Sequence, residues 1–291
     1  MRLITRARVL RRAYDDASDG KDSRGGDIPP IYQAYIIDRL GLETPTLHTP
    51  KELRAQDSAE LRKRMVAAYL CICAELGKQV RYAYAEMVFQ MCDKCVRDYL
   101  WQMDEIYKVS GVDIDEFCHS VVPTEKQDVA LRRAGKNKCE YVPVSGISTP
   151  IVTLRLIESL SVLTTRLQTT IHEQRGLRSS ERGLFVLDAA TGSPTVAQNL
   201  RIIIEAADAG FLKIVEQRPQ QWVFRVHCSL AAAYGFSYRG AYYPVELRPA
   251  DLNSLISESD PDRRSLLLER MEAWMGTDTS GDLPLFREAD I

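Results

Sequence analysis

Lys21 and Lys136 each follow a glycine, an arrangement from which a nucleotide phosphate site could be built. Lys21 lies in the segment Asp19–Ser23, and Lys136 follows Gly135. A phosphate-binding loop also needs a second glycine at a fixed distance, a hydroxyl group for Mg²⁺ and an apolar strand before it. Neither segment has these features, and no acidic pair closes an apolar strand to hold the metal. We therefore expect both segments to be loops, and we expect no catalytic residue, enzymatic activity or cofactor in this chain alone.

Four cysteines could be drawn as zinc ligands: Cys71, Cys73, Cys92 and Cys95. Both pairs fall within helical patterns, where residues i and i+2 point apart, whereas structural zinc sites usually present their ligands from turns. Small buried hydrophobic residues are the better interpretation, so we predict no metal site. No histidine lies in a recognised nucleophile motif, and no hydrolytic site is predicted either. The histidines are His48, His119, His172 and His227.

The amino-acid composition is typical of a globular protein with a net charge near zero. The chain has 291 residues, 45% of them hydrophobic, with 38 Lys and Arg against 40 Asp and Glu. The length favours two domains, and the near-zero net charge excludes a global attraction to nucleic acid or anionic membranes. Seven cysteines, an odd number, and the lack of a secretory apolar start suit reduced thiols in the cytoplasm. No run of about 18 apolar residues predicts a membrane span.

Helical periodicity dominates the first half of the chain. Residues 1–29 predict a basic N-terminal helix followed by a flexible, glycine-rich loop. Residues 30–110 carry three amphipathic stripes, the last from Val80 to Tyr107, and predict a bundle of three helices. Residues 111–147 are less periodic and are interpreted as a short helix and a surface connector. That connector contains a basic group: Arg132, Arg133, Lys136 and Lys138.

The second half has the order of a winged helix-turn-helix domain, predicted over residues 148–250. Ser148-Thr149-Pro150 starts a helix that stops near Gly176, and Ser193-Pro194 starts another that ends at Gly210. Two strand-like runs, Phe211–Glu216 and Trp222–Val226, then predict a β-hairpin wing. Residues 251–291 are acidic and are expected to form a surface tail. The predicted fold class is mainly α, a helical bundle followed by a winged helix.

Two blocks of sequence carry a resemblance to a known family. The first combines Val80–Ala83 with Asp93–Leu100, and the second combines Phe224–His227 with Gly235–Pro244. With them, most of residues 30–250 resembles the C-terminal half of ORC-type AAA+ ATPases, in particular their bacterial members. The resemblance implies that residues 30–110 are the helical lid of such an ATPase and that a winged helix follows. It also implies that ATP and Mg²⁺ are bound only when a separate or missing ATPase core, with its phosphate-binding loop, is present.

Arg97 matches the lid arginine that reaches the γ-phosphate of ATP in this family. The rigid guanidinium group suits that role because it can bind phosphate oxygens in a bidentate manner. A second interpretation is open, in which Arg97 forms a solvated helical pair with Asp93 or Asp98.

Double-stranded DNA is the partner that a winged helix suggests. The helix that starts at Pro194 would enter the major groove and present Gln198, Asn199 and Arg201, because Asn and Gln can read adenine edges. Arg218 and Gln220 in the wing would contact the backbone or minor groove. The alternative is an interaction or scaffold subunit of a bacterial defence or DNA-maintenance system, in which the winged helix docks onto another protein or onto an ATPase core.

Overall fold

The structure is a computed structural model that describes residues 66–67, 69–74, 77–169, 181–188, 194–218, 220–240 and 242–277. The chain divides into two units, residues 1–80 with 168–181 and residues 81–167 with 182–291. In the first unit, residues 69–74 are helical and the thiol of Cys71 donates to the carbonyl of Gln168 at 3.5 Å. The predicted N-terminal helix, its loop and the first helix of the bundle lie outside the described residues. All further description concerns the second unit.

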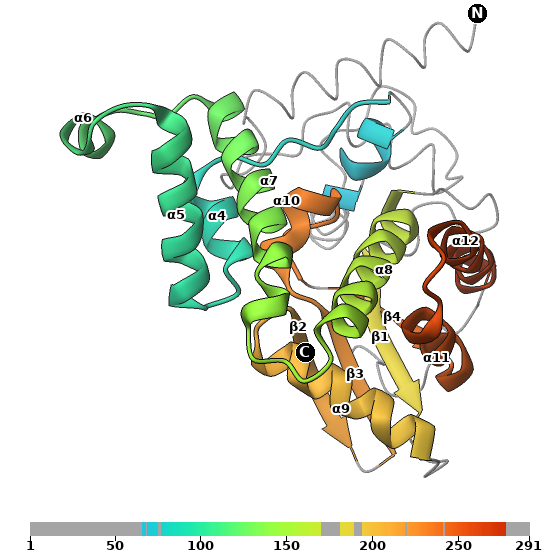
Figure 1. Cartoon of the computed structure of the whole chain (residues 1–291). Helices are drawn as coiled ribbons and strands as arrows, with labels where there is room; N and C mark the ends of the chain where they lie inside the picture. The colour runs from blue at the N-terminus through green and yellow to red at the C-terminus, as the bar shows by residue number, and fades with distance from the viewer. Residues whose placement is uncertain are drawn as a thin grey trace, which may run out of the picture. The chain divides into compact units, whose positions relative to one another are not determined.

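A four-stranded mixed sheet forms the centre of the second unit (Figure 1). Its order is β2-β3-β1-β4, with antiparallel pairs β2–β3 and β1–β3 and a parallel pair β1–β4. The predicted hairpin is therefore confirmed, but it belongs to a larger sheet, and a winged helix with a separate β-hairpin wing is not what the structure shows. The strands are β1 (Arg182–Asp188), β2 (Leu212–Arg218), β3 (Gln221–Val226) and β4 (Tyr243–Leu247).

Besides β4, the sequence analysis missed the strand β1. Its central residues from Leu184 to Leu187 are all buried, so the run lacks the alternation of a half-exposed strand. β1 also separates the two helices that were expected to form a helix-turn-helix. β1 lies between α8 and α9 in the chain, and it pairs with β3 and β4.

The two helices with strong start signals are confirmed as α8 (Pro150–Thr169) and α9 (Pro194–Asp208). The hydroxyl of Ser148 donates to the carboxylate of Glu205 in α9 at 2.6 and 2.8 Å, which places an anion near the first turn of α8. Gly210 ends the α9 region with a φ of +83°, a conformation that glycine adopts without strain. α9 packs against β2 and against α11.

The helical region before α8 differs from the prediction in two places. The expected single helix from Val80 to Tyr107 is broken at residues 92–95, where Asp93 and Lys94 have φ values of 49° and 67°. The expected surface connector contains the 17-residue helix α7, which packs along α5 and buries several side chains. The elements are α4 (Ala85–Met91), α5 (Val96–Ser110), α6 (Ile114–His119), α7 (Thr124–Glu140) and the turn η1 (Val142–Val144).

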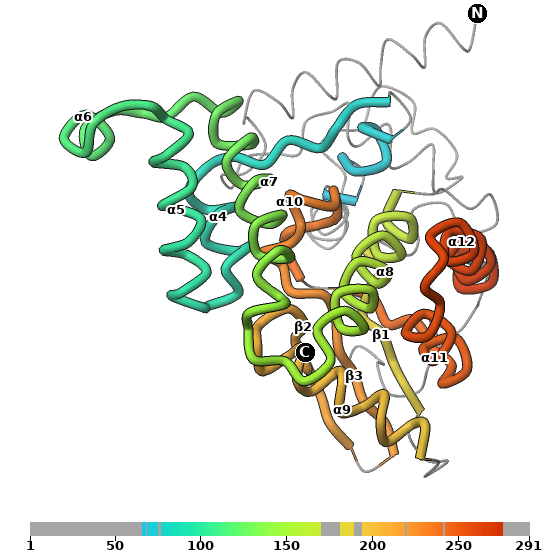
Figure 2. Tube along the Cα trace, viewed as in Figure 1, coloured from blue at the N-terminus to red at the C-terminus, as the bar shows by residue number. Residues whose placement is uncertain are grey.

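The first part of the expected acidic surface tail is also built into the core. α11 (Pro249–Ser257) and α12 (Pro261–Thr277) bury apolar side chains along their inner faces. The buried residues are Leu252, Leu255, Ile256, Leu268, Met271 and Met275. Figure 2 follows this path from β4 through α11 into α12. Residues 278–291 lie outside the described part of the chain, and no described helix is long and apolar enough to cross a membrane.

Gly135 allows α7 to approach the short helix α10 (Ala231–Tyr234), which follows the turn η2 (Cys228–Leu230). A Cβ atom at Gly135 would lie 2.8 Å from the Cβ of Ala233 and 3.4 Å from the carbonyl oxygen of Ser229. Neither neighbour is a flexible side chain end, so the helices would have to separate.

We predict that Gly135→Ala lowers the free energy of unfolding by about 1–3 kcal/mol through overpacking. At a helical position with free space around it, replacing Gly by Ala would instead raise the free energy of unfolding by up to about 1 kcal/mol. Denaturant titration followed by circular dichroism measures the effect. The double variant G135A/A233G removes the opposing methyl group and should recover most of the loss, and a stabilised single variant would contradict the packing argument.

Candidate functional site

The two sequence blocks that carry the resemblance meet in space. The hydroxyl of Tyr82 in the first block donates to the carbonyl of Phe236 in the second at 2.6 Å, and both side chains are buried. Asp93 in the first block pairs with Arg225 in the second. Around this contact lies a group of polar side chains that we call the ionic cluster. Its members are Asp93, Asp98, Lys138, Lys213, Arg225, His227 and Ser229.

Asp93 holds two cations of the sheet with one carboxylate oxygen. Its Oδ2 atom lies 2.7 Å from the guanidinium of Arg225 in β3 and 2.7 Å from the ammonium of Lys213 in β2. Asp93 can do this because it lies in the left-handed turn between α4 and α5, a conformation that Asp and Asn tolerate better than most residues. Arg225 also lies 3.0 Å from the sulfur of Cys228 and stacks over the ring of Tyr242.

Asp98 and Lys138 form the second half of the cluster, between α5 and α7. The ammonium of Lys138 donates to both carboxylate oxygens of Asp98 at 2.9 Å and to the hydroxyl of Ser229 at 2.8 Å. The Nδ1 atom of His227 lies 2.8 Å from the same hydroxyl and 3.4 Å from Asp98. Asp98 and Lys138 are buried, so their mutual charge and hydrogen bonds offset the cost of removing them from water.

Burial sets the protonation state of His227. Desolvation lowers its pKa well below the ordinary value of 6.5, and the positive charges of Lys138, Arg225, Lys213 and Arg97 lower it further. Burial also lowers the pKa of Lys138, and the charge of Asp98 opposes that shift. At neutral pH the imidazole is therefore uncharged, and its contact with Ser229 is a hydrogen bond between neutral groups.

Ser229, His227 and Asp98 have the residue types of a hydrolytic triad, but their arrangement does not present a nucleophile. The hydroxyl of Ser229 lies against Lys138 as well as His227, and the serine is 4% exposed. A hydrolytic triad instead needs an open position for the substrate carbonyl beside the hydroxyl. The geometry of the ionic cluster is suited to holding α5, α7 and the sheet together.

Arg97 lies at the start of α5, where its side chain is exposed. Its guanidinium donates to the carbonyl of Ala209 at 3.3 Å, at the end of α9 where the helix dipole is negative. The ion pair that the sequence suggested with Asp93 or Asp98 is not made, because both carboxylates are engaged by other cations.

The residues predicted to contact DNA divide into exposed and buried ones. Gln198, Arg201, Arg218 and Gln220 are exposed or largely exposed, whereas Asn199 is only 3% exposed and lies on the inner face of α9. The prediction for Asn199 is corrected because it shares the inward face with Val196 and Ile203. Arg201 pairs with Glu205 at 3.1 Å, and Arg218 pairs with Glu216.

No group of side chains suited to a metal is found among the described residues, and none of the seven cysteines is in a disulfide. Gly135-Lys136 lies inside α7 rather than in the expected loop. Its backbone N–H groups therefore donate to helical hydrogen bonds and are not free to bind a phosphate. Lys21 lies outside the described residues.

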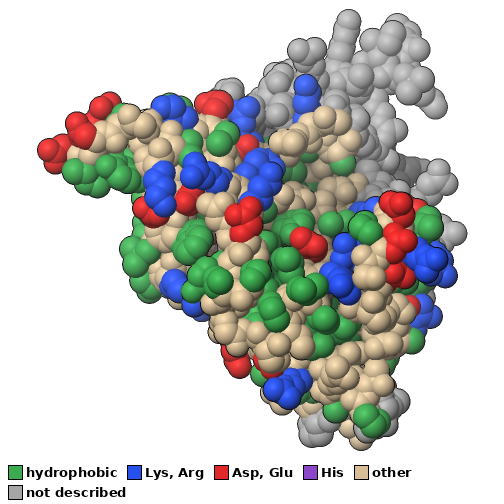
Figure 3. All heavy atoms as spheres, in the orientation of Figure 1, with side chains coloured by type: hydrophobic (Ala, Val, Ile, Leu, Met, Phe, Trp, Pro, Cys, Tyr) green, Lys and Arg blue, Asp and Glu red, His purple; other side chains and the backbone are tan. Residues whose placement is uncertain are grey.

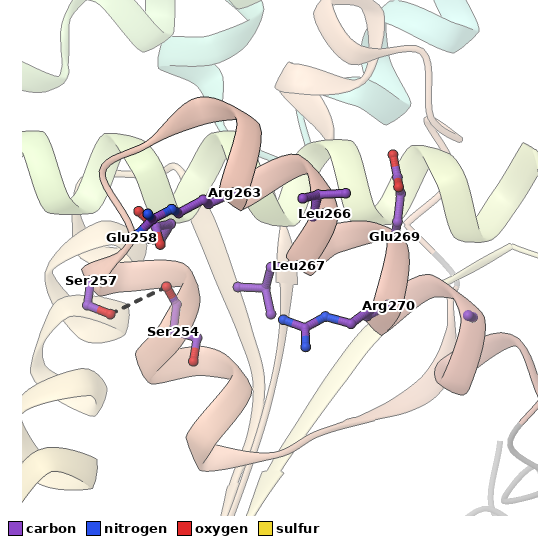
Figure 4. A pocket seen from close by; sticks show the side chains of 9 residues that line it. Ser254, Ser257, Glu258, Arg263, Leu266, Leu267, Glu269 and Arg270 are labelled. Carbon is purple, nitrogen blue, oxygen red and sulfur yellow. Dashed lines mark hydrogen bonds between the residues drawn. The ribbon is translucent and has the colours of Figure 1, made fainter.

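A groove of about 700 Å³ lies between α11 and α12 (Figure 4). Leu266, Leu267 and Ala273 contribute apolar surface, and charged side chains from Glu258, Arg263, Glu269 and Arg270 surround them. Its cations and anions are balanced, and it contains none of the residues that the sequence analysis predicted to bind a ligand.

The comparison with family models agrees with the two sequence blocks. A model described as ORC-CDC6-like matches residues 27–247, a range that contains both blocks and the whole ionic cluster. The chain belongs to the ORC-CDC6-like family. No curated protein and no solved structure matches the chain at a significant level. Sequence reasoning missed the roles of Lys138, Lys213 and His227, although the charged positions in the apolar run Phe224–His227 were a signal of buried polar contacts.

We predict that Asp93→Asn lowers the free energy of unfolding by about 3 kcal/mol, because it leaves the buried guanidinium of Arg225 without its counter-charge. Asn tolerates the left-handed backbone, so the loss of stability would come from the missing charge and not from strain in the turn. Denaturant titration measures the change. Glu125→Gln is the control, since Glu125 is exposed in its pair with Arg81 and the change should cost far less stability than the change at Asp93. Equal losses in the two variants would contradict a special role of the cluster.

We also predict that stability falls as the pH drops below about 6.5, with a contribution from His227 of at most about 1.4 kcal/mol per pH unit. The unfolded chain binds a proton at His227 in this range, whereas the folded chain does so only at lower pH. Above this range the group contributes no slope. His227→Gln, which cannot titrate, should flatten the curve of melting temperature against pH between pH 6.5 and the lower folded pKa. An unchanged slope would show that other groups control the pH dependence.

Proposed function

We propose that this chain is a non-catalytic part of an ORC-like ATPase that binds double-stranded DNA with the start of α9 and the turn of the β2–β3 hairpin. Membership of the ORC-CDC6-like family supports a role of this type. The observation that carries the proposal is the placement of the exposed polar residues. Gln198 and Arg201 lie on the outer side of α9, and Arg218 and Gln220 lie at the hairpin turn.

These two groups lie at the same end of the unit. α9 has 15 residues and spans about 22 Å, and β2 has seven residues and spans about 23 Å. The chain reverses at residues 209–211, and β2 packs against α9. The end of β2 therefore returns to the start of α9, so that one DNA duplex could contact both groups.

The charges at this end suit a modest and salt-dependent affinity. Arg201 and Arg218 each have a glutamate partner, but surface pairs of this kind are weak. Phosphate oxygens can replace the glutamates at small cost, and the released counterions make binding sensitive to salt.

ATP enters this proposal only through another domain or polypeptide. Arg97 is exposed at the start of α5 and would contact a phosphate held by an ATPase core after releasing the carbonyl of Ala209. The resemblance to AAA+ lids supports this assignment, and Mg²⁺ would likewise be held by the core.

Fluorescence anisotropy with a labelled DNA duplex at several salt concentrations tests the DNA-binding part. The double variant R201A/R218A should bind more weakly and reduce the slope of log affinity against log salt by about 2. Arg263→Ala is the control, because Arg263 is exposed on α12 and pairs loosely with Asp260 at 3.7 Å. Absence of salt-dependent binding by the native chain, or an equal effect of the control, would contradict the proposed site.

A second candidate function is that of an interaction or scaffold subunit of a bacterial defence or DNA-maintenance system, with the α9–hairpin end docking onto a protein. The pairing of both arginines with glutamates favours it, because it leaves this surface close to neutral. Co-purification with an ATPase subunit, together with indifference to DNA, would support this function over the first.

A further inference from the structure

α5 has the reverse of the usual distribution of polar and apolar side chains. The face that packs on α7 buries Asp98, Gln102 and Glu105, together with Ile106. The opposite face exposes Val96, which is 71% accessible, and Leu100, which is 61% accessible. Figure 3 shows hydrophobic side chains at the surface on the side where Figure 1 places α4, α5 and α7. A helix face that exposes Val96 and Leu100 while Asp98 and Glu105 are buried on the other side is suited to a partner.

Four apolar residues of α5, two exposed and two half-buried, follow a heptad pattern. Val96, Leu100, Met103 and Tyr107 are separated by four, three and four residues, which is the spacing of the seam of a coiled coil. Val96 and Leu100 are exposed, and Met103 and Tyr107 are half-buried. Phe89 of α4 is a further exposed aromatic side chain of the neighbouring helix.

The charged residues beside this seam would be complementary between two copies of α5. Arg97 and Asp104 are seven residues apart and therefore occupy the same heptad position at one edge of the seam. When two copies of a helix pair antiparallel about a two-fold axis, like edges face each other. With the axis near residues 100–101, Arg97 of each copy faces Asp104 of the other, and the two Leu100 side chains meet at the centre. An isologous interface requires this kind of pattern.

We propose that α5 forms a homodimer interface in which two copies of this chain pair their α5 helices antiparallel through Val96, Leu100, Met103 and Tyr107. The interface lies on a different surface from the proposed DNA-binding end, and it does not depend on DNA binding. It takes Arg97 away from Ala209 toward Asp104 of the second copy. An ATPase core that uses Arg97 would therefore compete with the dimer.

Sedimentation equilibrium of the full chain over about a hundredfold range of concentration tests this inference. The native chain should show a monomer–dimer equilibrium. Leu100→Glu places two like charges at the two-fold axis and should weaken association by about 100-fold. Leu266→Glu on α12 is the matched control, because Leu266 is 60% accessible and the substitution is the same. This control should associate like the native chain.

A charge exchange separates the proposed geometry from a general effect of surface charge. Arg97→Glu and Asp104→Arg should each weaken the dimer, because each places like charges opposite one another. The double variant R97E/D104R should restore association to within about threefold of the native chain. A native chain that stays monomeric, equal behaviour of the two leucine variants, or failure of the double variant to restore dimers would each overturn the inference. Unchanged DNA affinity in these variants would leave the proposed function standing.

Discussion

The carboxylate of Asp93 is the constraint on which the arrangement of the second unit depends. One oxygen atom holds Arg225 of β3 and Lys213 of β2, both at 2.7 Å. Arg225 is buried, and a buried guanidinium without a counter-charge is costly. The sheet therefore requires a carboxylate at this point, and the left-handed turn at residues 93–94 is the local structure that supplies it. A continuous helix from α4 to α5 could not present Asp93 in this way, which explains the break.

The same constraint determines the orientation of α5. Asp98 lies five residues after Asp93 and forms an ion pair with Lys138 of α7. With both carboxylates directed inward, α5 must bury its polar face, and Gln102 and Glu105 follow on that side. Val96 and Leu100 are consequently left outside. The exposed apolar seam is thus a geometric consequence of where the charges are needed, and no rotation of α5 could bury the seam without breaking the ion pair of Asp98.

Signals within a few residues of an element's ends predicted the fold best. Proline at the first helical position located the starts of α8 and α9, glycine after the last one located the end of α9, and β-branched and aromatic residues located the hairpin. Contacts between distant segments were not predictable in this way. β1 depends on partners from residues 221–226 and 243–247, and the break before α5 depends on cations more than 100 residues away. A single sequence carries no local mark of such pairs.

The basic residues of α7 show why a count of charges could not locate a binding site. The sequence placed Arg132, Arg133 and Lys138 together on a surface connector, yet the helix directs them to different partners. Lys138 faces Asp98 inside the protein, Arg132 bonds to Asp128 and to the carbonyl of Ala232, and Arg133 pairs with Glu105. Their charge is used within the fold. Contacts around the start of α5, by contrast, join distant parts of the unit. Arg97 donates to the carbonyl of Ala209, and Asp93 pairs with Lys213 in the strand that follows α9. α5 therefore contacts the end of α9 through Arg97, and the turn before α5 is joined through Asp93 to β2.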